Sequence, residues 1–137
     1  MSDAETTSPA IAPEAAAELR HEMRTPVNHI IGYAEMLQED SAVGSPIGAA
    51  LTEILAIARA VLERINAALP PSGVTSEANL DGLLKELVSH QRRLLHCTTQ
   101  LTVMSADDLF SSDVAKIAVA AHKLTNPPRP EIGRAHV

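Results

Sequence analysis

Residues 19–33 read Leu19-Arg20-His21-Glu22-Met23-Arg24-Thr25-Pro26-Val27-Asn28-His29-Ile30-Ile31-Gly32-Tyr33. Large apolar residues in and after this stretch recur at steps of three or four, which is the spacing of the buried stripe of a packed helix. His21 lies two residues from Leu19, so about 200° around a helix at roughly 100° per residue, and it points away from the stripe. The pattern predicts an amphipathic helix with an exposed histidine, whose stripe is formed by Leu19, Met23, Val27, Ile30, Ala34 and Leu37.

This first helix is predicted to begin at Pro13, because proline suits the first turn of a helix, and to end near Glu39. A second helix is predicted from Ser45-Pro46, a cap followed by a first-turn proline, to about Ala68. The two helices, joined by a short turn, form an antiparallel hairpin over residues 13–69. The apolar positions of the second helix are Leu51, Ile54, Ala58, Val61, Ile65 and Leu69, with Leu55 and Leu62 beside them.

Composition supports an all-α fold, because the chain is 45% apolar but only 1% aromatic, which favours helix packed on helix over a sheet. A single hairpin leaves its apolar stripe open to water. Two copies that pair would bury the stripes in a four-helix bundle, so packing alone predicts homodimerisation. Gly32 lies inside the first helix, and we expect it at a close contact between helices.

The run from His21 to Asn28, followed by Ile30-Ile31-Gly32-Tyr33, resembles the H-box of sensor histidine kinases. The likeness is dense over residues 18–37 and extends more loosely to Leu69. It implies that residues 13–69 are a dimerisation and histidine-phosphotransfer domain, which forms a four-helix bundle on homodimerisation.

The resemblance also assigns roles to four residues. His21 is the expected phosphoacceptor, because one nitrogen of a neutral imidazole is nucleophilic near pH 7. Glu22 is expected to accept the proton of the other ring nitrogen and to orient the ring. Thr25 matches the position that orients a water for dephosphorylation of the partner, and Arg24 is either a phosphate contact or a solvated surface charge. His29 is interpreted as a boundary residue without a chemical role.

Residues 70–78 are predicted to be a linker, and two interpretations of residues 79–126 remain open. One is a second helical hairpin, with a break at residues 105–112 and a new helix after the Ser112-Asp113 cap. The other is the truncated, degenerate start of an ATP-binding domain, with a strand at residues 100–104. Its last helix would be an N-box in which Ala120 stands where the family has an Mg²⁺-binding asparagine.

Both ends of the chain fall outside these units. Residues 1–12 are rich in Ser, Thr, Ala and Pro without a period, which predicts a disordered tail. Residues 127–137 are interpreted as a linker followed by an artefact, because Glu131 to Val137 match the translation of a common sequencing adapter. The natural chain is expected to continue beyond Pro130.

Charge and composition exclude several classes of function. The net charge is −6, from 11 basic and 17 acidic residues, which argues against binding to nucleic acid or to an anionic membrane. No apolar run is long enough to span a bilayer, so we expect a cytoplasmic protein. Cys97 is the only cysteine, and no histidine has zinc-ligand spacing with it, so no metal site is expected.

The sequence therefore predicts a phosphorelay protein, phosphorylated on His21, that passes the phosphoryl group to an aspartate of a response-regulator receiver domain. The resemblance implies a fragment of a protein-histidine kinase whose ATP-binding part is absent or degenerate here. No cofactor is expected in these residues, and ATP and Mg²⁺ belong to a partner kinase domain, in cis or in trans. The alternatives are a phosphotransfer and docking module, or a dimerisation scaffold, without kinase activity.

Overall fold

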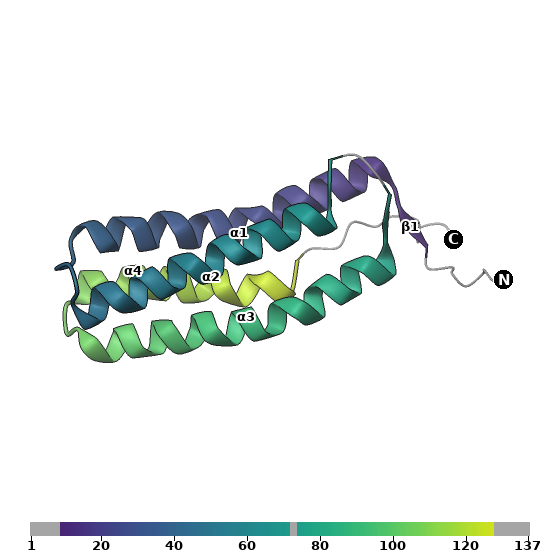
Figure 1. The fold of residues 1–137 in the computed structure, drawn as a ribbon. Coiled ribbons are helices and arrows are strands. Elements are labelled where there is room, and N and C mark those ends of the chain that lie inside the picture. Colours follow the sequence, from purple (N-terminus) through teal and green to yellow (C-terminus); the bar gives the residue numbers. More distant parts are fainter. Residues whose placement is uncertain (1–8, 72–73, 128–137) are drawn as a thin grey trace.

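The computed structural model describes residues 9–71 and 74–127. Its main elements are four helices, α1 (Pro13–Glu39), α2 (Pro46–Ala68), α3 (Glu77–Met104) and α4 (Asp108–His122), which a short 3-10 helix, η1 (Lys123–Thr125), follows. The strands β1 (Ala10–Ile11) and β2 (Thr75–Ser76) form one antiparallel pair (Figure 1). The prediction of an all-α protein is confirmed, with this small sheet as an addition.

Helices α1 and α2 begin where their prolines predict. Pro13 and Pro46 both occupy the first turn, where a helix has no partner for the N–H that proline lacks. The Ser45 side chain caps α2, because its Oγ accepts a hydrogen bond of 3.0 Å from the backbone N–H of Gly48. The ends of the two helices, Glu39 and Ala68, also agree with the pattern of the sequence.

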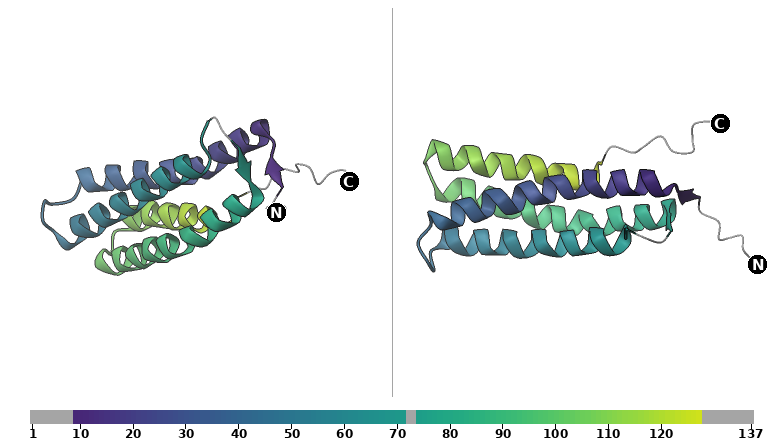
Figure 2. Two further views of the ribbon diagram at one scale, coloured as in Figure 1. Left: turned by 45° about the vertical axis from the view of Figure 1, so that its right-hand side comes forward. Right: turned by 90° about the horizontal axis from the view of Figure 1, so that it is seen from above.

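The four helices form one bundle within a single chain (Figure 2). Helix α1 packs against α2 and α4, and α3 packs against the same two helices from the other side. The hairpin of α3 and α4 therefore covers the apolar stripe that the sequence analysis left open for a second copy. The packing argument for a homodimer no longer holds, because side chains such as Val27, Ile30 and Val61 are already fully buried within one chain.

Two short segments that were expected to be irregular are ordered. Residues 1–12 were predicted to be a disordered tail, but Ala10 and Ile11 form β1, and Ile11 is buried; residues 1–8 lie outside the described residues. The predicted linker at residues 70–78 contains β2 and the first two residues of α3. Ile11 pairs with Thr75, so the sheet fastens the start of one hairpin to the start of the other.

The region from 79 to 126 consists of α3, α4 and η1, with non-helical backbone only at residues 105–107 and 126. The strand that the ATP-binding interpretation required at residues 100–104 is wrong, because these residues belong to the last turns of α3. The expected cap at Ser112-Asp113 is also wrong. Helix α4 begins earlier, where Asp107 Oδ1 accepts hydrogen bonds from the backbone N–H groups of Leu109 and Phe110. Among the described residues, no helix is both long and apolar enough to cross a membrane.

Gly32 does not lie at a close helix contact, so that expectation was wrong. A Cβ added at Gly32 would meet no atom within 4 Å, and its backbone is helical. Gly32→Ala should therefore raise the free energy of unfolding by about 0.5–1 kcal/mol in urea titrations, because alanine loses less backbone entropy on folding. Gly44→Ala is the contrasting control: Gly44 has φ of +79° in the turn before α2, so alanine there should destabilise the protein. A destabilising Gly32→Ala would contradict the open environment.

Cys97 is buried inside the bundle on α3. Burial raises the pKa of its thiol above the usual 9.0, the Glu53 carboxylate adds to this increase, and Arg93 opposes it. The thiol should therefore stay protonated at neutral pH and react with a disulfide reagent far more slowly in the native protein than in urea. Because the folded-state pKa is raised, the stability that the neutral thiol contributes is lost as pH rises through that pKa. Equal labelling rates in both states would contradict this burial.

Candidate functional site

Helix α1 presents His21 to solvent between two buried residues of its stripe, Leu19 and Met23. The apolar face of the helix fixes this direction, because turning His21 inward would bring the stripe into water. Glu22, the next residue, is exposed as well. The structure therefore exposes an imidazole and a carboxylate at consecutive positions of α1.

Thr25 lies one turn after His21 and is half-buried. Its Oγ1 donates a hydrogen bond of 2.9 Å to the backbone carbonyl oxygen of His21. The hydroxyl proton is thus used within the helix, and the oxygen lone pairs stay available as acceptors. Pro26 is buried inside the helix and has no N–H to give to the carbonyl of Glu22.

Arg24 is half-buried and makes no ion pair with another described residue, so its charge is available to an anion that approaches this part of α1. Arg20 behaves differently. Its Nη1 donates to the carbonyl oxygens of Leu69 and Pro70, at 3.0 Å and 3.2 Å, where α2 ends. Arg20 thereby binds the end of α2 to α1 directly beside His21, and the sequence analysis missed this role because the partners are 49 and 50 residues away.

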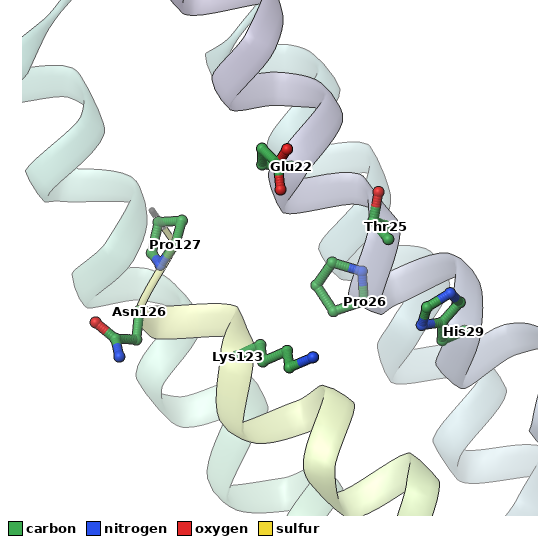
Figure 3. A pocket seen from close by; sticks show the side chains of 7 residues that line it. All are labelled: Glu22, Thr25, Pro26, His29, Lys123, Asn126 and Pro127. Carbon is green, nitrogen blue, oxygen red and sulfur yellow. The ribbon is translucent and has the colours of Figure 1, made fainter. Parts of the chain in front are cut away.

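A surface hollow lies between α1 and the end of the second hairpin (Figure 3). We call it the α1–η1 hollow. Lys123, in η1, extends its side chain toward α1 across this space. The α1–η1 hollow is lined by Glu22, Thr25, Pro26 and His29 from α1, and by Lys123, Asn126 and Pro127 from the other side.

The hollow brings together residues that the sequence analysis treated separately. Glu22 and Thr25 were expected at the site, whereas His29 was interpreted as a boundary residue and is exposed at the hollow. Lys123 and Asn126 were missed. Only the packing of α4 against α1 brings them here, and no spacing within the sequence indicates it. The hollow combines an acid, an imidazole, a hydroxyl and an ammonium group, which can together bind and move protons near an anionic group.

In the comparison with family models, residues 14–69 match the His Kinase A (phospho-acceptor) domain. No curated protein and no solved structure matches the chain significantly. The matched range covers almost all of α1 and α2 and contains His21 with its neighbours. Residues 14–69 are therefore similar to the His kinase A phospho-acceptor domain, the dimerisation and histidine-phosphotransfer domain of sensor histidine kinases.

Proposed function

We propose that this protein is a phosphorelay intermediate that accepts a phosphoryl group on His21 and passes it to an aspartate of a receiver domain. The observation that carries the proposal is the exposed His21–Glu22 pair, which lies inside the range that matches a phospho-acceptor domain. A phosphoacceptor must be open on one side to its donor and later to its acceptor, and His21 meets this need.

The residues around His21 support a defined chemical step. One imidazole nitrogen attacks phosphorus, and the bond between phosphorus and the leaving oxygen of the donor breaks as the new N–P bond forms. The proton on the other ring nitrogen is accepted by the carboxylate of Glu22, which also holds the ring in the reactive tautomer. Arg24 contributes positive charge toward the transferring group, and Thr25 keeps acceptor lone pairs for a water.

The phosphoryl donor is proposed to lie outside the described residues. The two helices α3 and α4 complete the bundle, and residues 100–104 are helical instead of forming the strand of an ATP-binding domain. This observation favours the phosphotransfer module over a self-contained kinase. The donor is then a phosphorylated receiver domain or an ATP- and Mg²⁺-dependent kinase domain elsewhere, and the acceptor is a receiver domain.

The test is phosphoryl transfer to the intact chain, first from ATP and then from a panel of receiver domains phosphorylated with acetyl phosphate. We expect an acid-labile label from receivers, lost in His21→Ala and retained in His96→Ala, an exposed histidine on α3 outside the α1–η1 hollow. Label from ATP alone would indicate a kinase within the chain. Absence of label from every donor would overturn the phosphorelay proposal and leave the dimerisation or docking scaffold.

A further inference from the structure

The two hairpins repeat the same order of elements. Each begins with a two-residue strand, continues with a long helix and ends, after a turn, with a second helix. Helix α1 has 27 residues and α3 has 28. The two strands pair with each other, and one of their two residue pairs is Ile11 with Thr75. When two equal units are related by a two-fold rotation, a residue that pairs with its own counterpart in the other unit lies on the rotation axis.

Burial shows the same relation residue by residue. Adding 64 to a number in α1 gives its counterpart in α3, so that Pro13 corresponds to Glu77 and Ile11 to Thr75. Six buried positions then coincide along the two helices, whereas Pro26, Val27 and Cys97 are buried without a buried counterpart. The coinciding pairs are Ala16 with Leu80, Leu19 with Leu83, Met23 with Leu87, Ile30 with Leu94, Ala34 with Thr98, and Leu37 with Leu101.

Adding 63 to a residue number in α2 gives its counterpart in α4. The shift is 63 instead of 64 because the stretch between the last buried residue of the first helix and the matching buried residue of the second is one residue shorter in the second hairpin. Here five buried positions of α2 coincide with buried positions of α4 and η1, whereas Ala50 and Leu55 are buried without a buried counterpart. The pairs are Leu51 with Val114, Ile54 with Ile117, Ile57 with Ala120, Ala58 with Ala121, and Val61 with Leu124. The bundle order agrees as well, since α1 packs on α4 as α3 packs on α2.

We infer that residues 75–124 are a degenerate internal copy of the phosphoacceptor hairpin, which takes the place of a second protomer. The bundle is then complete in one chain and acts as a monomer with a single phosphoacceptor site. The statement about the site rests on the proposed function; the statement about the repeat does not.

The copy retains part of the site but lacks its nucleophile. Lys85 is the counterpart of His21, and it is followed by Glu86 and Ser89 at the positions of Glu22 and Thr25. A lysine ammonium group has three donors and no lone pair, so it cannot attack phosphorus. We call this position the Lys85 site.

The acid at the Lys85 site is also held differently. Glu86 Oε1 accepts hydrogen bonds from Arg64 of α2, at 2.8 Å from Nη2 and 3.1 Å from Nε. The counterpart of Arg64 is Pro127, which lines the α1–η1 hollow opposite Glu22 (Figure 3). Helix α4 has 15 residues against 23 in α2, so the second hairpin ends before it can place an arginine there. At the Lys85 site the carboxylate of Glu86 is therefore held in an ion pair with Arg64. Beside His21, Glu22 has no arginine at the corresponding position.

A single-chain bundle of this kind fits one receiver domain at a time. The face around His21 offers the proposed nucleophile, whereas the equivalent position of the second hairpin holds Lys85 in place of a histidine. A symmetric dimer would instead present two equal faces. The two cases differ in mass and in the number of phosphoryl groups per bundle.

The first part of the test does not depend on phosphorylation. Ala10→Cys with Ser76→Cys, in a Cys97→Ser background, joins two residues that face each other in the strand pair, at a separation that a disulfide can bridge. We expect oxidation to give a disulfide within one chain, and light scattering of the unmodified protein to give one chain of 14.5 kDa. Ala10→Cys with Val103→Cys is the control, because Val103 lies at the opposite end of α3 and should form no such bond. A disulfide-linked dimer, or a two-chain mass, would overturn the inference.

The second part counts phosphoryl groups on the intact chain. After transfer from the phosphorylated receiver panel, native mass spectrometry should find one phosphoryl group per chain in the wild type and in Lys85→Ala, and none in His21→Ala. A second phosphoryl group on residues 75–124 would overturn the single-site inference. Absence of any phosphoryl group would refute the proposed function and the single site together, while the disulfide experiment would still decide the internal repeat.

Discussion

Glu22→Gln should slow phosphoryl transfer to His21 by about 100-fold or more, because general acid–base groups typically contribute 10²–10⁴ to such steps. The substitution keeps the size of the side chain and removes the negative charge that accepts the imidazole proton. Glu22 is exposed, so folding should be unaffected. The measurement is the rate of label appearing on the protein at saturating phosphorylated receiver, with far-ultraviolet circular dichroism as a check on folding.

Glu86→Gln is the matched control for this experiment. Glu86 occupies the position on α3 that Glu22 occupies on α1, and its exposed ion pair with Arg64 is worth about 0–1 kcal/mol. We expect it to leave the transfer rate unchanged. If the two substitutions slowed transfer equally, the effect would come from overall charge, and Glu22 would have no role at His21. A pH profile separates these cases further, since only loss of the local base should change its shape.

Leu94→Ala should lower the free energy of unfolding by about 2–5 kcal/mol, a large part of the 5–15 kcal/mol that holds a typical domain together. Leu94 is fully buried where α3 meets the rest of the bundle. Removing its side chain leaves a cavity that the long, rigid helices cannot easily close. The measurement is urea denaturation followed by circular dichroism.

Val103→Ala on the same helix is the control for Leu94→Ala. Val103 is 82% exposed, so its truncation should change stability by no more than about 0.5 kcal/mol. Because the two hairpins share one core, Leu94→Ala should lower a single cooperative transition that includes α1 and α2. Two separate transitions, with the one for α1 and α2 unchanged, would show that the hairpins fold independently.

Local signals were sufficient to predict the first hairpin. The prolines at 13 and 46, the Ser45 cap and the apolar steps of three and four act within a few residues, and the structure agrees with them. The exposure of His21 followed from the same periodicity. Family resemblance added the proposed chemistry, and residues 14–69 match a phospho-acceptor domain.

Contacts between distant segments could not be predicted in the same way. The pairing of Ile11 with Thr75 joins residues whose local sequences give no strand signal, and two-residue strands leave no alternation to detect. The α1–η1 hollow depends on where α4 ends, and Lys123 carries no local sign that it faces α1. The helical start at Asp108 was missed because Asp107 and the later Ser112-Asp113 pair are equally good caps by sequence alone.

Because α3 and α4 bury the apolar stripe of α1 and α2 within one chain, the stability of the bundle should not depend on protein concentration. A bundle built from two chains loses its fold as the concentration falls, because unfolding and dissociation are one equilibrium. A bundle closed within one chain unfolds in a unimolecular reaction, so its melting temperature should be the same in nanomolar and micromolar solution. The surface around His21 then stays assembled in a cell that holds only a few copies of the protein.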